Sequence, residues 1–206
     1  MDSEPLWIRA RKSLVHEANG RWLPEANTAM MGISSDQWSV YMRDRLGVAM
    51  PPSKIRDEVI ARMIQLYRME VPLLPGARAA VETIARRWRL GVASGSDRIL
   101  LDTVLTNSGL EGHFAATVSG DEVAEGKPSP LIYLTACRRL RCSPDACVAI
   151  EDSASGIASA LAADMKVIAV PRPGFEPPPA VLERAVAVLP SLTELDPDLI
   201  AAVLSA

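Results

Sequence analysis

The chain has 206 residues, of which 49% are hydrophobic and 23% are charged, and its formal net charge is -3 at pH 7. This length allows one domain, or one domain with a small insertion, and the composition is that of a globular protein with a sizeable core. The mild negative charge excludes the basic surface that nucleic-acid binding requires. Because no stretch resembles a membrane span or a secretory leader, we expect a soluble, cytoplasmic monomer without a membrane or nucleic-acid partner.

The first third of the chain, residues 5–71, is predicted to be helical. Apolar side chains recur at three- and four-residue spacing over 55–67, which is typical of an amphipathic helix. Ser35 or Asp36 is expected to cap a preceding helix, and Gly47 is expected to end it. This region contains no convincing strand.

From residue 72 onward, short apolar runs alternate with helical segments. The predicted strands are 90–93, 115–118, 147–150 and 166–170, and the predicted helices are 76–88, 99–108, 131–140 and 155–163. Such alternation indicates right-handed β-α-β units and a parallel sheet with both faces covered. We therefore predict an α/β fold, a doubly wound parallel sheet with a helical module beside it.

Two polar segments follow predicted strands, where a doubly wound sheet binds its ligands. Ser94-Gly95-Ser96 lies before a helix, and a hydroxyl with backbone N–H groups at such a place can hold an anion. The alternative is that Ser96 only caps the helix. Lys127 precedes Pro128, which disfavours helical geometry at the lysine and places its ammonium in an extended loop, suited to phosphate. The alternative is a solvated surface lysine.

Adjacent carboxylates, Glu151 and Asp152, end the most apolar predicted strand. They are costly there unless a cation receives them. Mg²⁺ is the natural candidate, because it takes oxygen ligands from one or two carboxylates and from phosphate. Alternatively, Asp152 caps the next helix.

The chain has three cysteines, Cys137, Cys142 and Cys147. An odd number argues against a disulfide framework. Their spacing matches no zinc pattern, since no Cys-x-x-Cys pair or nearby histidine accompanies them. We therefore predict small buried thiols.

Four segments in this order resemble successive motifs of the haloacid-dehalogenase superfamily, and more narrowly its branch of β-phosphoglucomutase and small sugar phosphatases. They are Leu74-Pro75-Gly76, Val92-Ala93-Ser94-Gly95-Ser96, Gly126-Lys127-Pro128-Ser129-Pro130 and Ile150-Glu151-Asp152-Ser153-Ala154-Ser155-Gly156. The resemblance covers nearly the whole chain. It implies a helical cap over 3–71 and an α/β core formed by 1–2 and 72–206.

The resemblance also implies roles for five residues. Ser94 would hold the transferring phosphoryl group, and the backbone of Gly95 would donate to it. Lys127 would neutralise charge on the phosphate and the nucleophile. Asp152 would bind Mg²⁺, with Glu151 as its partner through water. A minor departure is Asp164, which stands where the family often has a glycine at a helix end; aspartate tolerates the left-handed conformation.

One departure from the family is severe. Its nucleophile and its acid/base are two aspartates of an Asp-x-Asp motif on a strand that would precede Asp2, and no such motif follows an N-terminal strand here. That strand would lie between the strands ending at Ser94 and Glu151, which we therefore expect to lack a shared partner. We expect this chain to be barely stable and inactive.

The resemblance predicts a magnesium-dependent phosphatase for a small phosphorylated metabolite, a sugar or sugar-alcohol phosphate, acting through an aspartyl-phosphate, with the start codon assigned too far downstream. One alternative is a non-catalytic remnant that binds a phosphorylated ligand or a protein. Another is a phosphotransferase resembling β-phosphoglucomutase.

Overall fold

The computed structural model describes residues 1–205. Its contacts divide it into two compact units. The helical unit comprises Asp2–Pro72 and Ile99–Ser108, and the α/β unit comprises Met1, Leu73–Arg98 and the chain from Gly109 onward. The segment Ile99–Ser108, which the sequence prediction assigns to the core, thus makes its contacts with the helical unit.

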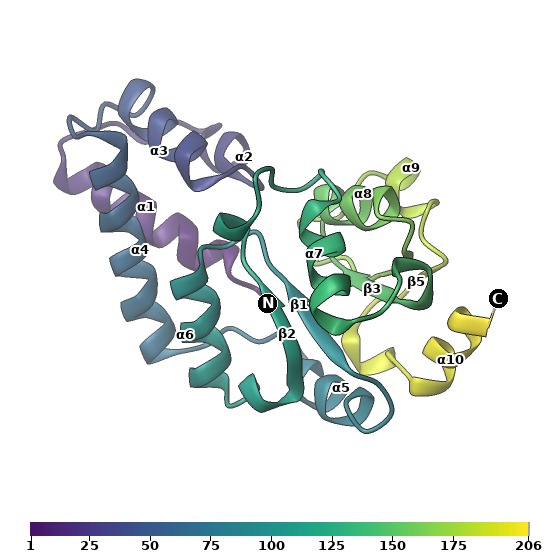
Figure 1. Ribbon diagram of the computed structural model, residues 1–206. Helices are drawn as coiled ribbons and strands as arrows, with labels where there is room; N and C mark the ends of the chain where they lie inside the picture. Colours follow the sequence, from purple (N-terminus) through teal and green to yellow (C-terminus); the bar gives the residue numbers. More distant parts are fainter. Residues whose placement is uncertain (206) are drawn as a thin grey trace. The chain divides into compact units, whose positions relative to one another are not determined.

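The helical unit contains no strand within residues 2–72, as predicted. Its helices are α1 (Glu4–Glu17), α2 (Ala26–Met30), α3 (Ser35–Asp44), α4 (Pro52–Met69) and α6 (Arg98–Ser108). The buried residues of α4 are Ile55, Val59, Met63 and Tyr67, at the predicted spacing, and α1 and α3 both pack against this helix. In α6, Asn107 Nδ2 donates to the Tyr67 carbonyl at 3.0 Å, so α6 lies beside α4 (Figure 1).

The start of α3 differs from the prediction. Ser34, not Ser35 or Asp36, is the N-cap, because its Oγ accepts from the Gln37 backbone N–H at 3.3 Å while Gln37 Oε1 accepts from Ser34 N–H at 3.0 Å. This reciprocal arrangement is a capping box, which requires a glutamine or glutamate three residues after the cap. The helix also ends at Asp44, before Gly47.

Within residues 1–205, the α/β unit has five strands, and every strand pair is parallel, as predicted. The strands are β1 (Leu90–Ala93), β2 (Phe114–Val118), β3 (Val148–Glu151), β4 (Lys166–Ala169) and β5 (Ala187–Val188). The helices are α5 (Ala77–Ile84), α7 (Leu131–Leu140), α8 (Ala154–Ala162), α9 (Pro179–Leu182) and α10 (Pro197–Ser205), with short 3-10 helices at Glu111–His113, Gly120–Glu122, Pro144–Ala146 and Leu192–Glu194. The prediction missed only the two-residue β5 among the strands.

The strands form two separate sheets, β1–β2 and β3–β4–β5. Within residues 1–205, β1 pairs only with β2, and β3 reaches β1 through no ladder of hydrogen bonds. This is the arrangement expected if the strands ending at Ser94 and Glu151 lack a shared partner. Ile150 of β3 is 36% exposed, so this strand is less covered than the both-face burial predicted for it.

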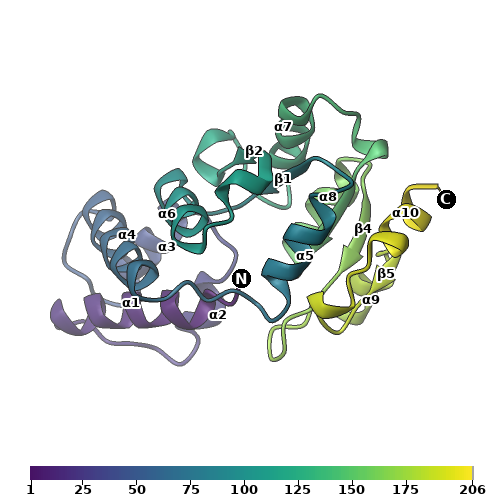
Figure 2. The same cartoon turned by 90° about the horizontal axis from the view of Figure 1, so that it is seen from below.

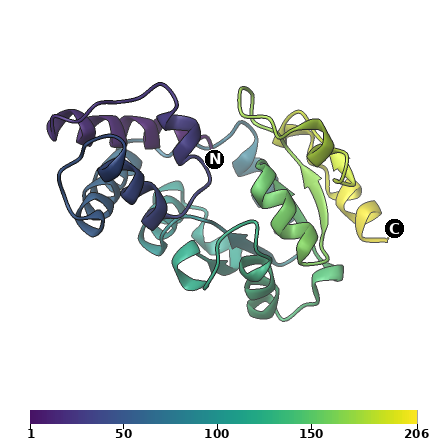
Figure 3. The same ribbon diagram turned by 90° about the horizontal axis from the view of Figure 1, so that it is seen from above.

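Two apolar layers cover opposite faces of the β3–β4–β5 sheet. One layer joins β3 and β4 to α7 and α8 and includes Ala149, Ile157 and Val167. The other joins Ile168 of β4 to α5 and α10. Figures 2 and 3 show α10 beside β4, and in Figure 3 the green α8 and the yellow α10 lie on opposite sides of that strand. Nowhere in residues 1–205 does a helix combine the length and the apolarity needed to cross a membrane.

Candidate active site

The carboxyl end of β3 holds a fully bonded carboxylate, Glu151, whose residue is only 7% exposed. Its Oε1 accepts from Lys127 Nζ and from the Tyr133 hydroxyl at 2.6 Å. Its Oε2 accepts from the backbone N–H of Asp152 at 3.0 Å and of Ser153 at 3.3 Å, and from Ser153 Oγ at 3.2 Å. Five donors therefore hold one buried carboxylate in a single orientation.

This network decides the charge state of Glu151. Burial by itself raises the pKa of the carboxyl, but the Lys127 ammonium and the hydrogen bonds from Tyr133 and Ser153 outweigh it and hold the pKa below its ordinary value. Burial raises the pKa of Tyr133, and the neighbouring Glu151 charge raises it further, so Tyr133 remains a donor. Lys127 also lies 5.0 Å above the Tyr133 ring, a cation–π contact. The alternative of a solvated loop lysine therefore does not hold.

The turn after β3 is shaped around this carboxylate. Ser153 is the N-cap of α8, since its Oγ accepts from Gly156 N–H at 3.0 Å. A Cβ on Gly156 would lie 2.1 Å from the Glu151 carboxylate, so only glycine allows the helix to approach it so closely. Because Ser153 is the N-cap, the alternative that Asp152 caps this helix is wrong.

Asp152 is the carboxylate that remains accessible, with 31% of its side chain exposed. Its Oδ2 pairs with Arg172 Nε at 2.7 Å. A partly exposed carboxylate of this kind suits a hard cation that keeps several waters, such as Mg²⁺. Both oxygens of Glu151 already accept from protein donors, which suits that residue to fixing Lys127 and the Asp152 backbone instead of binding an ion directly.

The loop after β1 is held mainly by its backbone. Ser94 N–H donates to the Val118 carbonyl at 2.9 Å, and Ser94 Oγ accepts from Ser96 N–H at 3.2 Å. Gly120 packs against this loop, since a Cβ there would lie 2.3 Å from the Gly95 carbonyl oxygen. By contrast, a Cβ on Gly95 would meet no atom within 4 Å, so open space borders the predicted anion-binding loop.

The structure thus brings Lys127, Glu151 and Asp152 into one cluster. Ser94 and Gly95 stand at the carboxyl end of the other sheet, and the described residues show no hydrogen bond between them and that cluster. The convergence of Ser94 with Lys127 and Asp152 on one pocket stays a prediction.

The sequence prediction did not include Tyr133 and Arg172, and it named Ser153 and Gly156 within a motif without giving them a role. These four residues hold the two carboxylates in place. A serine immediately before a small-residue helix is an N-cap signal that could have identified Ser153. Tyr133 and Arg172 give no local signal, because their contacts depend on the fold.

Comparisons with known proteins identify the family of the chain. Residues 2–164 match the family of haloacid dehalogenase-like hydrolases. Hexitol phosphatase B of Escherichia coli K12 is 36% identical over 203 residues, which cover 95% of this chain and 89% of that protein. A phosphorylated carbohydrates phosphatase of Thermotoga maritima is 27% identical over 169 residues, 82% of this chain and 78% of that protein.

A solved structure shows the same fold. CbbY from Rhodobacter sphaeroides in complex with phosphate has a TM-score of 0.85 and 26% identity, over 100% of this chain and 94% of that one. The family match spans well over half of the sequence, and the hexitol phosphatase match covers most of both proteins. This chain therefore belongs to the haloacid dehalogenase-like hydrolase family.

Proposed function

We propose that this chain forms the phosphate- and metal-binding part of a magnesium-dependent phosphatase for a small sugar or sugar-alcohol phosphate. The observation that carries the proposal is the Lys127–Glu151–Asp152 cluster at the carboxyl end of β3, where an α/β sheet binds its ligand. The similarity to hexitol phosphatase B over 95% of this chain supports the substrate class.

Each residue of the cluster has a chemical task in this proposal. Lys127 neutralises negative charge on the bound phosphoryl group, and Glu151 fixes the position of its ammonium. Asp152 offers its partly exposed carboxylate to the divalent metal that hydrolases of this family generally use. Bound there, the metal would supply electrostatic stabilisation of the phosphoryl oxygens. Ser94 Oγ and the Gly95 N–H would hold the same oxygens from the end of β1.

The nucleophile is the remaining part of the proposal. The resemblance to the family assigns it to an aspartate on a strand between β1 and β3, which no ladder of hydrogen bonds joins within residues 1–205. A second aspartate two residues later would protonate the leaving oxygen and then activate water for hydrolysis of the aspartyl-phosphate.

Activity assays on two forms of the protein test this function. About ten residues with an apolar strand and an Asp-x-Asp motif are added before Asp2, enough for one strand of ordinary length with a short connection. We expect no hydrolysis of hexitol phosphates by residues 1–206 and Mg²⁺-dependent hydrolysis by the extended form. The added strand should also raise the melting temperature. An extended form with Asn-x-Asn in place of Asp-x-Asp is the matched control, and it should show the same rise in melting temperature but no activity.

The same assay on an Asp152→Ala variant of the extended form should show loss of nearly all turnover, and Glu151→Gln a smaller loss. Hydrolysis by residues 1–206 alone would refute the assignment of the nucleophile. An extended form that melts higher, binds sugar phosphate and hydrolyses nothing would instead favour a binding protein.

A further inference from the structure

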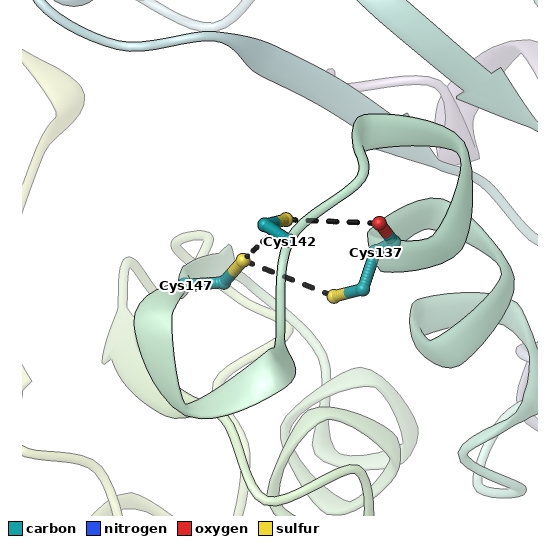
Figure 4. A group of neighbouring side chains, drawn as sticks. All are labelled: Cys137, Cys142 and Cys147. Atoms are coloured by element: carbon teal, nitrogen blue, oxygen red, sulfur yellow. Dashed lines mark hydrogen bonds between the residues drawn. The ribbon is translucent and has the colours of Figure 1, made fainter.

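The three cysteines meet at one point of the α/β unit, although no sequence pattern predicts this. Cys137 lies in α7 and is buried, while Cys142 and Cys147 are partly exposed, which corrects the prediction of three buried thiols. The Sγ–Sγ distances are 3.1 Å between Cys142 and Cys147 and 3.9 Å between Cys137 and Cys147, and all three sulfurs lie within 4.8 Å of one another (Figure 4). All three are free thiols.

Backbone hydrogen bonds hold the thiols in this arrangement. After α7, Arg141 takes a left-handed conformation, its N–H donates to the Arg138 carbonyl, and Cys142 N–H donates to the Cys137 carbonyl at 3.1 Å. This is a Schellman motif, which reverses the chain and returns Cys142 to the end of the helix. The 3-10 helix Pro144–Ala146 then turns the chain again, and Cys147 N–H donates to the Pro144 carbonyl at 2.9 Å. The sulfur positions are thus fixed by turns that require no metal.

We propose that Cys137, Cys142 and Cys147 together bind one soft divalent metal ion of the zinc class through three thiolates, with the fourth position open to solvent. Tetrahedral Zn–S bonds of about 2.3 Å place neighbouring sulfurs about 3.8 Å apart. The Cys137–Cys147 distance of 3.9 Å matches this spacing, and the Cys142–Cys147 distance of 3.1 Å would have to widen on binding. Thiolate is the ligand that selects soft ions over Mg²⁺. The partial exposure of Cys142 and Cys147 gives the ion an entry path and allows water as the fourth ligand.

Once the three thiols lose their protons, the negative charges of the thiolates favour a bound cation. Burial raises the pKa of Cys137, and burial together with the two neighbouring sulfurs raises the pKa of Cys147. Binding breaks three S–H bonds, forms three S–metal bonds and releases three protons to solvent, so the ion removes the repulsion between thiolates.

This site lies apart from the candidate active site. Cys147 immediately precedes β3, whereas Glu151 ends it, which separates them by about 13 Å of extended chain. An ion at the cysteines would join the end of α7 to the start of β3 and would stabilise this connection without touching the phosphate.

The test uses the reduced protein and Cd²⁺ as a spectroscopic probe, followed by competition with Zn²⁺. We expect one ion per chain, a thiolate-to-metal charge-transfer band with the intensity of three thiolates, and about three protons released per ion. Cys142→Ser and Cys147→Ser should each weaken Cd²⁺ binding at least about tenfold. Losses of that size follow even when the mutated residue only hydrogen-bonds to a metal ligand. Asp145→Asn, at an exposed carboxylate of the connecting turn, is the control and should bind as the parent does.

Two results would overturn the proposal. One is the absence of a charge-transfer band from the parent protein, a readout independent of how the variants fold. The other is unchanged Cd²⁺ affinity in folded Cys142→Ser and Cys147→Ser proteins.

Discussion

The two strand ends that carry the candidate active site differ in how tightly they are held. At the end of β3, Glu151 accepts five hydrogen bonds and has almost no exposed surface. At the end of β1, the Ser94 side chain accepts one hydrogen bond, from Ser96, and Gly95 borders open space. The first end is organised before any ligand arrives, whereas the second keeps donors available for one.

This difference suggests that the two strand ends have different functions. A buried ion pair such as Lys127–Glu151 fixes charge in one place, at a desolvation cost that the surrounding donors offset. A loop with free space beside a glycine lets backbone N–H groups approach an anion. Stability should therefore depend on the β3 end, and ligand binding on both ends.

The largest effect is expected from Glu151→Ala. Removing this carboxylate leaves the Lys127 ammonium without its partner in a site where its side chain is only 15% exposed. Loss of one member of a buried pair costs about 3–5 kcal/mol of unfolding free energy. Urea unfolding would measure it, with Asp198→Ala, which breaks the exposed Arg87–Asp198 pair, as a control expected to cost less than about 1 kcal/mol. Equal losses of unfolding free energy in the two variants would show that the buried pair at the β3 end contributes no more to stability than an exposed surface pair.

A pair of glycine substitutions compares the two ends with the same chemical change. Alanine in a helix interior is ordinarily favoured over glycine by about 1 kcal/mol. Gly156→Ala should nevertheless destabilise the protein by about 1–3 kcal/mol, because the new Cβ would overlap the Glu151 carboxylate. Gly95→Ala meets no atom and should change the melting temperature little. A Gly156→Ala protein that melts as high as the parent would show that the close approach is not needed.

The dependence of stability on pH gives a third comparison. The pKa of Glu151 is lowered in the folded state, so its stabilising contribution is complete above the ordinary value of 4.5 and is lost as the pH falls below it. The stability difference between the parent and Glu151→Gln should therefore shrink on acidification from pH 6 to about pH 3. Comparing these two proteins cancels the contribution of Glu122, whose pKa is also lowered. A difference that grows on acidification would contradict the assignment.

The smallest effect is expected from Ser94→Ala. This change removes one hydrogen bond, from Ser96 N–H in a turn, and should cost at most about 1 kcal/mol. Thermal melting measures this, and phosphate binding measured in parallel should weaken more than stability does. A loss of stability as large as that of Glu151→Ala would make Ser94 a structural residue.

Much of the α/β unit could be predicted from sequence because its signals are local. Strand Leu90–Ala93 and helix Leu131–Leu140 have the predicted bounds, and Asp164 adopts the left-handed conformation expected of it, with φ of 61°. Short apolar runs between helices suffice for such predictions. The cap of α3 was misplaced by one residue because several neighbouring side chains could serve.

The contacts between distant residues could not be predicted in this way. The partner of Lys127 proved to be Glu151, and the role of Tyr133 depends on the fold bringing its hydroxyl from α7 to the carboxyl end of β3, which no local pattern encodes. The cysteine cluster shows the same limit. Had the helix continued past Leu140, cysteines five residues apart would point in different directions. The chain reversals after Leu140 instead bring Cys142 and Cys147 to Cys137.

The most direct test of the account is a titration of the protein with inorganic phosphate in the presence of Mg²⁺, followed by the amide resonances of the two strand ends. If both ends hold one phosphate, the amides of Gly95 and Lys127 will shift together and yield one dissociation constant, and Asp152→Ala will weaken both responses. If only one of these amides responds, or if the two yield different constants, the two ends do not form a common site.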